Sequence, residues 1–243
     1  MSETAFEPTE RSRLGRQPIR GAYDEASVFA ILDAAVLAHV AYVIDGQPYV
    51  TPTAFWRVGR QLFWHGSSGS RMLNELSDGA EACVTVSLLD GLILAPSGFA
   101  HSINYRSVMA FGRARLVADA ETKRAALDRF IDRLYPGRAA SLRPATAEEL
   151  AKTSLVEMTI EEAAAKVRDA GVKALPEDAG WPAWSGVLPV ETHFGRGEPD
   201  LAVGARALGL RVAQPHHAGV RLDAALTAAA QVLDAAETAL APA

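Results

Sequence analysis

Cysteine is almost absent from the sequence. Cys83 is the one cysteine among 243 residues, which excludes an intrachain disulfide framework and a zinc site built from several cysteines. Cys83 lies within an apolar stretch, where a thiol is most often an inert core residue. The composition therefore does not call for an oxidising compartment.

A basic excess and a long apolar run are also missing. The formal net charge is -5, whereas nucleic-acid-binding proteins normally present a basic face. The longest apolar run, at 34–44, is interrupted by His39 and is too short to cross a bilayer. The first twenty residues are polar and contain no apolar stretch that would act as a signal sequence. These absences predict a cytoplasmic protein that contacts neither nucleic acid nor membrane.

What remains is an average globular composition, with 49% hydrophobic and 22% charged residues. Residues 1–22 carry prolines and glycines without periodicity and predict an N-terminal arm. Residues 23–195 hold the strand and helix patterns of one domain. Residues 196–243 form a C-terminal extension, in which the spacing of apolar residues predicts an amphipathic helix over 222–240.

Short strand patterns follow one another at close spacing in the main domain. Asp-Gly dipeptides at 45–46, 78–79 and 90–91 predict turns between them. The connections are too short for the crossover helices of a parallel sheet. We therefore expect a mainly β (α+β) protein in which an antiparallel sheet closes as a barrel with flanking helices. Strands are predicted at 39–44, 49–56, 61–65, 82–89, 92–95, 105–117 and 154–160.

Two helices have clear start signals. Asp24 and Asp119 are predicted N-caps, and the helix after Asp119 places Leu127, Phe130, Ile131 and Leu134 on one face that we expect to be buried. The charges of this second helix, Asp128, Asp132 and Arg133, are expected on its outer face.

The segment from His65 to Arg71 is the first candidate site. It follows a strand and contains small residues that allow a ligand to approach the backbone. Arg71 and the hydroxyl of Ser70 are suited to a phosphate, although a serine-glycine turn without a ligand explains the same residues.

Each of the other polar clusters also has two interpretations, a ligand site or a purely structural role. The strand entrance at 101–107 suits a polar, planar ligand or is a hydrogen-bonded loop end. Lys166 and Arg168 are either ligand-binding cations or a solvated pair, and Trp184 either stacks on a ligand or covers an interface. The adjacent histidines His216 and His217 would face opposite ways in a strand, which is poor geometry for one metal.

Taken together, these segments resemble a known family. The string from Asn104 to Ala114, NYRSVMAFGRA, closely resembles a strand of the pyridoxamine 5′-phosphate oxidase-related flavoproteins. The nitroimidazole-resistance (Nim-type) branch looks nearest. Weaker agreement in the same order comes from Val50–Pro52, His65 with Arg71, and Lys166. The last fifty residues extend beyond the resemblance, and the substrate-binding pattern of true pyridoxamine phosphate oxidases is not recognisable.

The resemblance implies a split β-barrel that forms a homodimer, with FMN in two clefts between the subunits. Ser70 and Arg71 would hold the FMN phosphate, and His65 would lie near the cofactor as a catalytic residue that donates a proton to a reduced substrate. Lys166, Arg168 and Trp184 would approach from the C-terminal part of the domain. The remaining cofactor-binding residues implied by the resemblance are Pro52, Thr53, Ala54, Phe55, Asn104, Tyr105, Arg106 and Ser107.

These residues lead to a functional hypothesis with two rivals. We expect an FMN-dependent oxidoreductase that reduces a small organic acceptor of nitroaromatic or quinone type, or oxidises a pyridoxamine-like amine. The first rival is a haem-binding split barrel with His193, His216 or His217 as ligand. The second is a flavin-binding sensor without catalysis.

Overall fold

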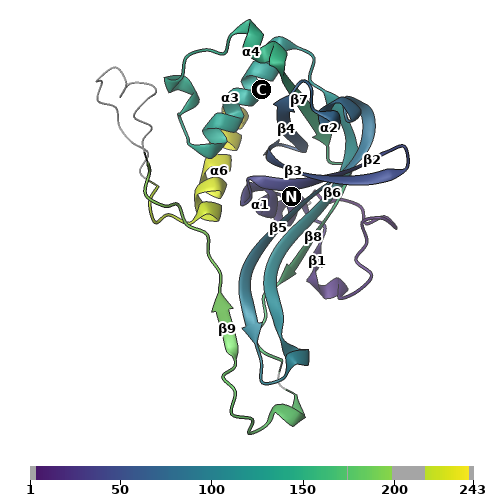
Figure 1. The fold of residues 1–243 in the computed structure, drawn as a ribbon, viewed down its shortest axis with the longest axis vertical. Coiled ribbons are helices and arrows are strands. Elements are labelled where there is room, and N and C mark those ends of the chain that lie inside the picture. The colour runs from purple at the N-terminus through teal and green to yellow at the C-terminus, as the bar shows by residue number, and fades with distance from the viewer. Residues whose placement is uncertain (1–3, 174, 199–216, 241–243) are drawn as a thin grey trace.

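Six antiparallel strands form a closed ring in the computed structural model, which describes residues 4–173, 175–198 and 217–240 (Figure 1). The strand order is β6-β7-β4-β3-β2-β5, and a further pairing of β5 with β6 closes the ring. This confirms the predicted mainly β class and the closure of an antiparallel sheet on itself. The strands are β2 (Leu37–Ile44), β3 (Gln47–Val58), β4 (Gln61–Ser67), β5 (Asp78–Leu94), β6 (Ser102–Leu116) and β7 (Thr153–Thr159).

The sheet splits at the point where β6 changes its partner strand from β7 to β8. One half of β6 pairs with β7, at Ala114↔Met158, and the other half pairs with β8 (Glu162–Arg168), at Phe111↔Glu162. Between these pairs, two residues of β6 (112–113) face three residues of the other segment (159–161), so β7 and β8 are one strand interrupted by a one-residue bulge. Gly112 lies at this point, where a Cβ would approach the carbonyl oxygen of Thr159 to 2.1 Å. The split of the barrel thus requires a residue without a side chain.

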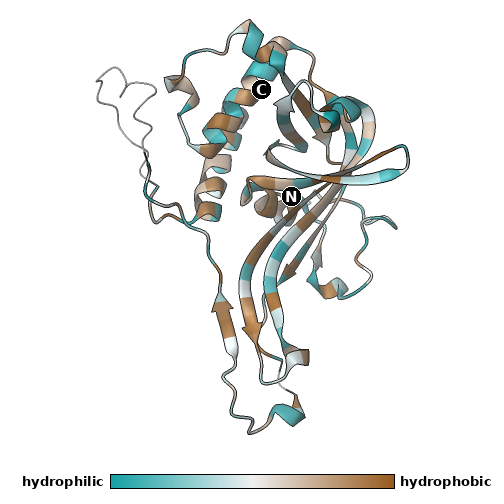
Figure 2. Ribbon diagram, viewed as in Figure 1, coloured by the Kyte–Doolittle hydropathy of each residue, from teal (hydrophilic) through white to brown (hydrophobic). Residues whose placement is uncertain are grey.

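Short strands extend the sheet at both edges. β1 (Gly21–Ala22) pairs with β8, and β9 (Gly186–Pro189) pairs with the far end of β5. Figure 2 shows hydrophobic residues along β9 and along the end of β5 beside it. The interior of the ring is filled by apolar side chains such as Val40, Phe55 and Trp64.

The three Asp-Gly dipeptides have two different structures. Asp45 and Gly46 have φ of 50° and 77° and make the predicted tight turn between β2 and β3. The turns predicted at 78–79 and 90–91 are wrong, because β5 runs without a break from Asp78 to Leu94 and shifts register against β6 at both dipeptides. Each dipeptide accommodates an irregularity within a paired strand.

The helices flank the ring. Asp24 caps the first of them, accepting from the Ser27 amide at 2.7 Å, and Asp119 caps α3, accepting from the Thr122 amide at 2.8 Å, so both predicted starts are confirmed. Figure 1 shows the C-terminal helix beside α3. Over the described ranges, no helix combines the length and apolar character needed to cross a membrane. The helices are α1 (Glu25–Asp33), α2 (Arg71–Glu75), α3 (Ala120–Leu134), α4 (Ala147–Lys152) and α6 (Leu222–Leu240), with 3₁₀ turns at Pro18–Arg20, Gly98–Ala100, Ala139–Ser141 and Pro176–Asp178.

The N-terminal arm packs against the barrel. Phe6 is buried, the Arg60 guanidinium lies 4.8 Å from its ring centroid, and Arg11 pairs with Glu162 at 2.6 Å. The arm therefore reaches the same strand, β8, that carries Lys166 and Arg168.

Candidate functional site

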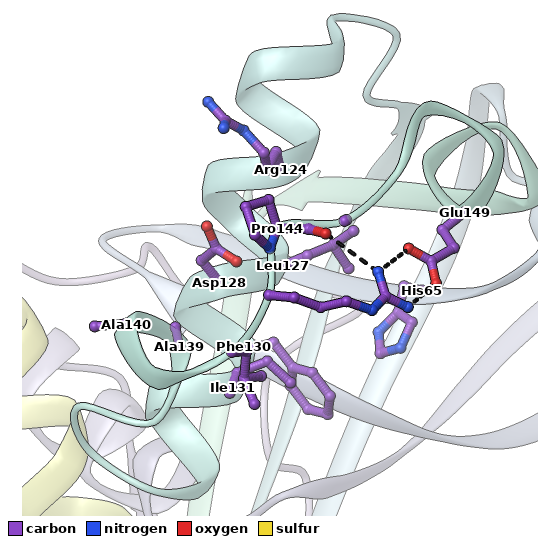
Figure 3. Close-up of a pocket in the computed structure, with 13 residues that line it drawn as sticks. His65, Arg124, Leu127, Asp128, Phe130, Ile131, Ala139, Ala140, Pro144 and Glu149 are labelled. Carbon is purple, nitrogen blue, oxygen red and sulfur yellow. Dashed lines mark hydrogen bonds and ion pairs between the residues drawn. The ribbon is translucent and has the colours of Figure 1, made fainter. Parts of the chain in front are cut away.

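His65 lines a cavity of about 550 Å³ between β4, α3 and the segment that leads to α4 (Figure 3). Most of the wall is apolar, and Arg124, Arg143, Asp128 and Glu149 also line it. The apolar lining residues are Leu127, Phe130, Ile131, Ala139, Ala140, Leu142, Pro144 and Ala145.

The cavity explains why the apolar face of α3 is only half-buried. Leu127, Phe130 and Ile131 are half-buried and line the cavity, and Leu127 and Phe130 also pack against the buried cluster around Trp56. Leu134, which the spacing also placed on the buried face, is exposed. A half-buried apolar helix face that lines a cavity is typical of a ligand pocket.

The imidazole of His65 is held in an aromatic setting. Its ring centroid lies 4.9 Å from that of Phe130 and 5.9 Å from that of Trp56. Its Nδ1 is buried and has no hydrogen-bond partner among the residues that the structure describes. Burial lowers the pKa of His65, because desolvation disfavours the imidazolium. At neutral pH the ring is therefore neutral, a state suited to binding a metal ion and poorly suited to donating a proton.

An ion pair holds the outer wall of this cavity. Arg143 donates to Glu149 at 2.9 Å, and Glu149 completes the capping box of α4 with Thr146. The hydrogen bond from Arg143, followed by the one from the Thr146 amide, lowers the pKa of Glu149 to about 2. The segment between α3 and α4 is thus fixed at its far end, where it covers the cavity.

Ser70 and Arg71 lie elsewhere, at the exit of β4. Backbone hydrogen bonds from Ser70 to Ser67 and from Ser68 to Lys152 make this segment an ordinary turn. The turn nevertheless leaves Arg71 exposed, with its guanidinium 4.5 Å from the ring centroid of Tyr49. Within the described ranges Arg71 has no hydrogen bond or ion pair. This cation is available to an external anion.

The predicted β3 residues lie on the neighbouring strand but not on one surface. Phe55 is fully buried inside the ring and Pro52 is exposed. Thr53 and Ala54 are half-buried, and the Thr53 hydroxyl donates to the Ala54 carbonyl at 3.3 Å. The Phe55 side chain therefore belongs to the core, and only the backbone of this strand and the other three residues are placed to contact a ligand.

The cluster at 104–107 is largely bound within the protein. Asn104 is 5% exposed, and its Oδ1 accepts from Arg168 at 2.9 Å and from the Ala170 amide at 3.1 Å. The Ser107 hydroxyl donates to the carbonyl of Lys166 at 3.3 Å. Tyr105 is half-buried between them. The interpretation as a hydrogen-bonded strand end therefore holds for Asn104 and Ser107.

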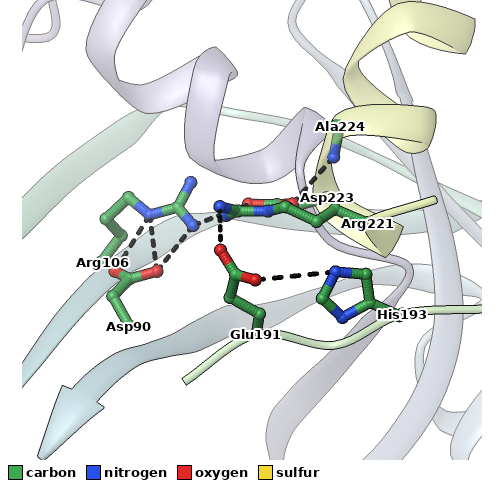
Figure 4. Close-up of polar contacts among 7 residues, drawn as sticks. All are labelled: Asp90, Arg106, Glu191, His193, Arg221, Asp223 and Ala224. Carbon is green, nitrogen blue, oxygen red and sulfur yellow. Dashed lines mark hydrogen bonds and ion pairs between the residues drawn. The ribbon is translucent and has the colours of Figure 1, made fainter. Parts of the chain in front are cut away.

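Arg106 anchors the C-terminal helix. It pairs with Asp90 at 2.7 Å and with Asp223, at the start of α6, at 3.0 Å (Figure 4). Arg221 bonds the same Asp223 and also pairs with Glu191. The hydrogen bond from Arg221 is the main cause that lowers the pKa of Asp223 to about 2. Arg106 is thus committed to two carboxylates of its own chain.

Lys166 and Arg168 share a third region with residues that sequence reasoning did not identify. They line a cavity of about 420 Å³ together with Arg16 and Arg20 of the arm and with Lys173. No local pattern signals this arrangement, because it depends on the pairing of β1 with β8. Trp184 lies apart, exposed, with its indole over Gly186, where a Cβ would approach it to 2.7 Å.

The comparisons with known proteins agree with this fold. The sequence model of the pyridoxamine 5′-phosphate oxidase family matches residues 24–167. The structure of the flavocytochrome Anf3 from Azotobacter vinelandii is 40% identical, with a TM-score of 0.75, and the match covers 85% of this chain and 99% of that one. The structure of the FAD and heme binding protein from Mycobacterium smegmatis is 37% identical, with a TM-score of 0.72 and coverage of 76% and 91%.

A nitroimidazole-type structure is more distant. The putative 5-nitroimidazole antibiotic resistance protein from Bacteroides thetaiotaomicron is 22% identical, with a TM-score of 0.50 and coverage of 60% and 86%. It shares the fold of this chain, at a lower identity than the two structures above. No curated protein matches the sequence.

Proposed function

The chain belongs to the pyridoxamine 5′-phosphate oxidase family, and from this premise we propose that it is a flavin-binding redox protein. The observation that carries the proposal is Arg71, an exposed cation without an anionic partner in the described chain, beside the stacked rings of Tyr49 and Tyr42. A guanidinium in this position suits the phosphate of FMN. The names of the 40% and 37% identical proteins favour a flavin for this chain as well.

The flavin site is part of a homodimer in this proposal. Arg71 lines neither the cavity of His65 nor the cavity of Lys166. A flavin whose phosphate binds Arg71 therefore needs a second surface to cover its isoalloxazine ring. Large apolar side chains are exposed on the outer faces of the strands, among them Leu37, Val50 and Met109. An exposed apolar surface of this kind marks an interface. The cytoplasmic location expected from the sequence belongs to the same proposal.

A second function, haem binding, is favoured by the cavity of His65. A haem needs an axial ligand and apolar walls, and its carboxylates need cations. The neutral imidazole of His65, which lines the cavity, fits the first need, and Leu127, Phe130 and Ile131 fit the second. Arg124 and Arg143 are the lining cations. A volume of about 550 Å³ is within the range of roughly 300–1,000 Å³ that holds small molecules. Bound haem would supply one-electron transfer.

His65 is a better ligand candidate than the C-terminal histidines. His193 is exposed and lies 3.6 Å from Glu191, and His217 packs against Tyr135 and Phe194. Neither lines the cavity of His65, and His216 lies outside the described residues. The low imidazolium fraction of His65 also weakens its proposed role as proton donor to a nitroaromatic or quinone.

The visible spectrum of the purified full-length protein tests both functions. We expect two flavin bands and a Soret band, and we expect extraction with chromatography to identify FMN or FAD. His65→Ala should abolish the Soret band and leave the flavin bands, whereas Arg71→Gln should lower flavin content and leave the Soret band. His193→Ala, an exposed histidine that lines neither this cavity nor the cavity of Lys166, is the control.

Each failure has its own meaning. A protein that binds no flavin when FMN or FAD is supplied contradicts the flavin proposal. A Soret band that survives His65→Ala contradicts the assignment of His65. With both cofactors bound, reduction of nitroaromatics and quinones distinguishes an oxidoreductase from a sensor.

A further inference from the structure

The cavity that contains Lys166 concentrates positive charge on an acidic protein. Five cations line it, from the N-terminal arm, β8 and the segment after β8: Arg16, Arg20, Lys166, Arg168 and Lys173. No carboxylate is among the described residues that line it. The whole chain has a net charge of -5, so this grouping is a local feature and not a consequence of composition.

Most of these cations have no partner within the protein. Across the described residues, the side chains of Arg16, Arg20, Lys166 and Lys173 form no hydrogen bond and no ion pair. Like charges at short range repel one another, so the arrangement costs stability unless an anion is bound. Arg106, by contrast, contacts two carboxylates.

The wall of the cavity is fixed before any ligand binds. Arg168 donates to the Ile103 carbonyl at 3.0 Å and to Asn104 at 2.9 Å. Asn104 is buried and also bonds both backbone groups of Ala170, which places the segment leading to Lys173. The pairing of Gly21 with Lys166 positions the arm on the other side. Cations that are positioned in advance bind an anion with little loss of conformational freedom.

We propose that this cavity binds the adenosine diphosphate moiety of a dinucleotide. Five cations exceed what one phosphate group requires and suit a diphosphate, whose oxygens accept hydrogen bonds from guanidinium groups. Phe99 lines the same cavity and is 87% exposed, which offers an aromatic face to a base. The source is either FAD, which rests on the proposed flavin function and would place both of its phosphates here rather than at Arg71, or a separate dinucleotide electron donor. The cavity binds the same chemical group in both cases.

Calorimetric titration of the full-length protein, freed of bound small molecules in high salt, tests the site with ADP itself. ADP binds more tightly than AMP or inorganic phosphate, and added salt weakens the binding. Arg16→Gln with Arg20→Gln lowers the ADP affinity by about tenfold or more for each guanidinium removed. Arg13→Gln, an exposed arm residue outside the cavity that contacts only the Pro8 carbonyl, leaves it unchanged.

Two results overturn the inference. One is ADP affinity no greater than that of AMP and phosphate, and the other is a double variant that binds ADP like the wild type. If the double variant does not fold, Lys173→Gln, at an exposed position, gives the same comparison for one charge.

Titrations with whole cofactors identify the source. If the moiety belongs to FAD, the wild type prefers FAD to FMN, ADP competes with FAD, and the double variant loses the preference while it keeps its FMN affinity. If it belongs to a separate donor, FAD and FMN bind alike, and a reduced nicotinamide dinucleotide competes with ADP. Binding of ADP without binding of any flavin contradicts the proposed flavin function and supports the cavity.

Discussion

Two groups of arginines in this protein differ in what surrounds them. Arg57 and Arg133 lie between the barrel and the helices. The side chain of Arg57 is 5% exposed and the whole residue Arg133 is 3% exposed. Each is surrounded by acceptors of the same chain. Arg16 and Arg20 line an open cavity and contact no acceptor in the described structure. A buried cation without partners is strongly unfavourable. The arginines left without partners are therefore those at the surface, where an external anion can reach them.

The buried pair holds three helices together. Arg57 binds Asp33 of α1 at 2.6 Å and Asp234 of α6 at 2.9 Å. Arg133 of α3 donates to the backbone carbonyls of Asp33 and Leu226, and to that of Ala35 at 3.4 Å. Burial lowers the pKa of Arg133 to about 10, which still leaves it charged at neutral pH.

Removal of a buried arginine is the largest effect we expect. Arg133→Ala removes the donor to three backbone carbonyls and leaves a hole between α1, α3 and α6. We expect it to lower the free energy of unfolding by about 3–5 kcal/mol, measured by urea denaturation. Arg124→Ala, on the exposed part of the same helix, is the control and should cost far less. An unchanged midpoint for Arg133→Ala would show that α6 does not depend on this contact.

Acid tests the ion pairs that join α6 to the sheet. The pKa of Asp223 is about 2 in the folded protein and about 3.9 in an unfolded chain. Its contribution is therefore present above about pH 4 and is lost as the pH falls from about 4 to about 2. We expect Asp223→Asn to be less stable at neutral pH and to lose less stability in this range. Urea midpoints at several pH values measure the difference, with Asp45→Asn in the exposed β2–β3 turn as control.

The smallest expected effect is at the unpartnered arginines. Arg16→Gln with Arg20→Gln should change the free energy of unfolding by no more than about 0.5 kcal/mol without ligand. At low salt the change should be toward greater stability, because charge repulsion is relieved. The same urea assay at low and high salt measures it. A large loss at both salt concentrations would mean that these side chains support the arm rather than bind a ligand.

Local signals in the sequence predicted much of the fold. The caps Asp24 and Asp119 and the turn at Asp45 depend on residues within a few positions, and the structure has them as expected. The dipeptides at 78–79 and 90–91 have the same two residues as 45–46, but they lie within β5, which stays paired to β6. Whether an Asp-Gly pair makes a turn or a bulge thus depends on the partner strand.

The sites were less predictable because distant segments form them. Arg133 was expected on the outer face of its helix, and it is buried because α6, almost a hundred residues later, covers that face. Arg16 and Arg20 showed no motif, since only the sheet brings the arm to Lys166. His65 was found from a resemblance, but the face of α3 that lines its cavity looked like an ordinary core pattern.

The bulge at residues 160–161 also fixes the sidedness of charge along this strand. Met158 before it and Ala163 after it both face the barrel interior, although they are an odd number of residues apart. If the same residues ran through this point as a regular strand without the bulge, the alternation that places Met158 inside would also place Lys166 and Arg168 inside. The same amino acids would then direct two cations into the apolar interior. The bulge is therefore a shift of phase along the strand: it keeps both cations outside the barrel, whereas an uninterrupted strand of the same sequence would bury them.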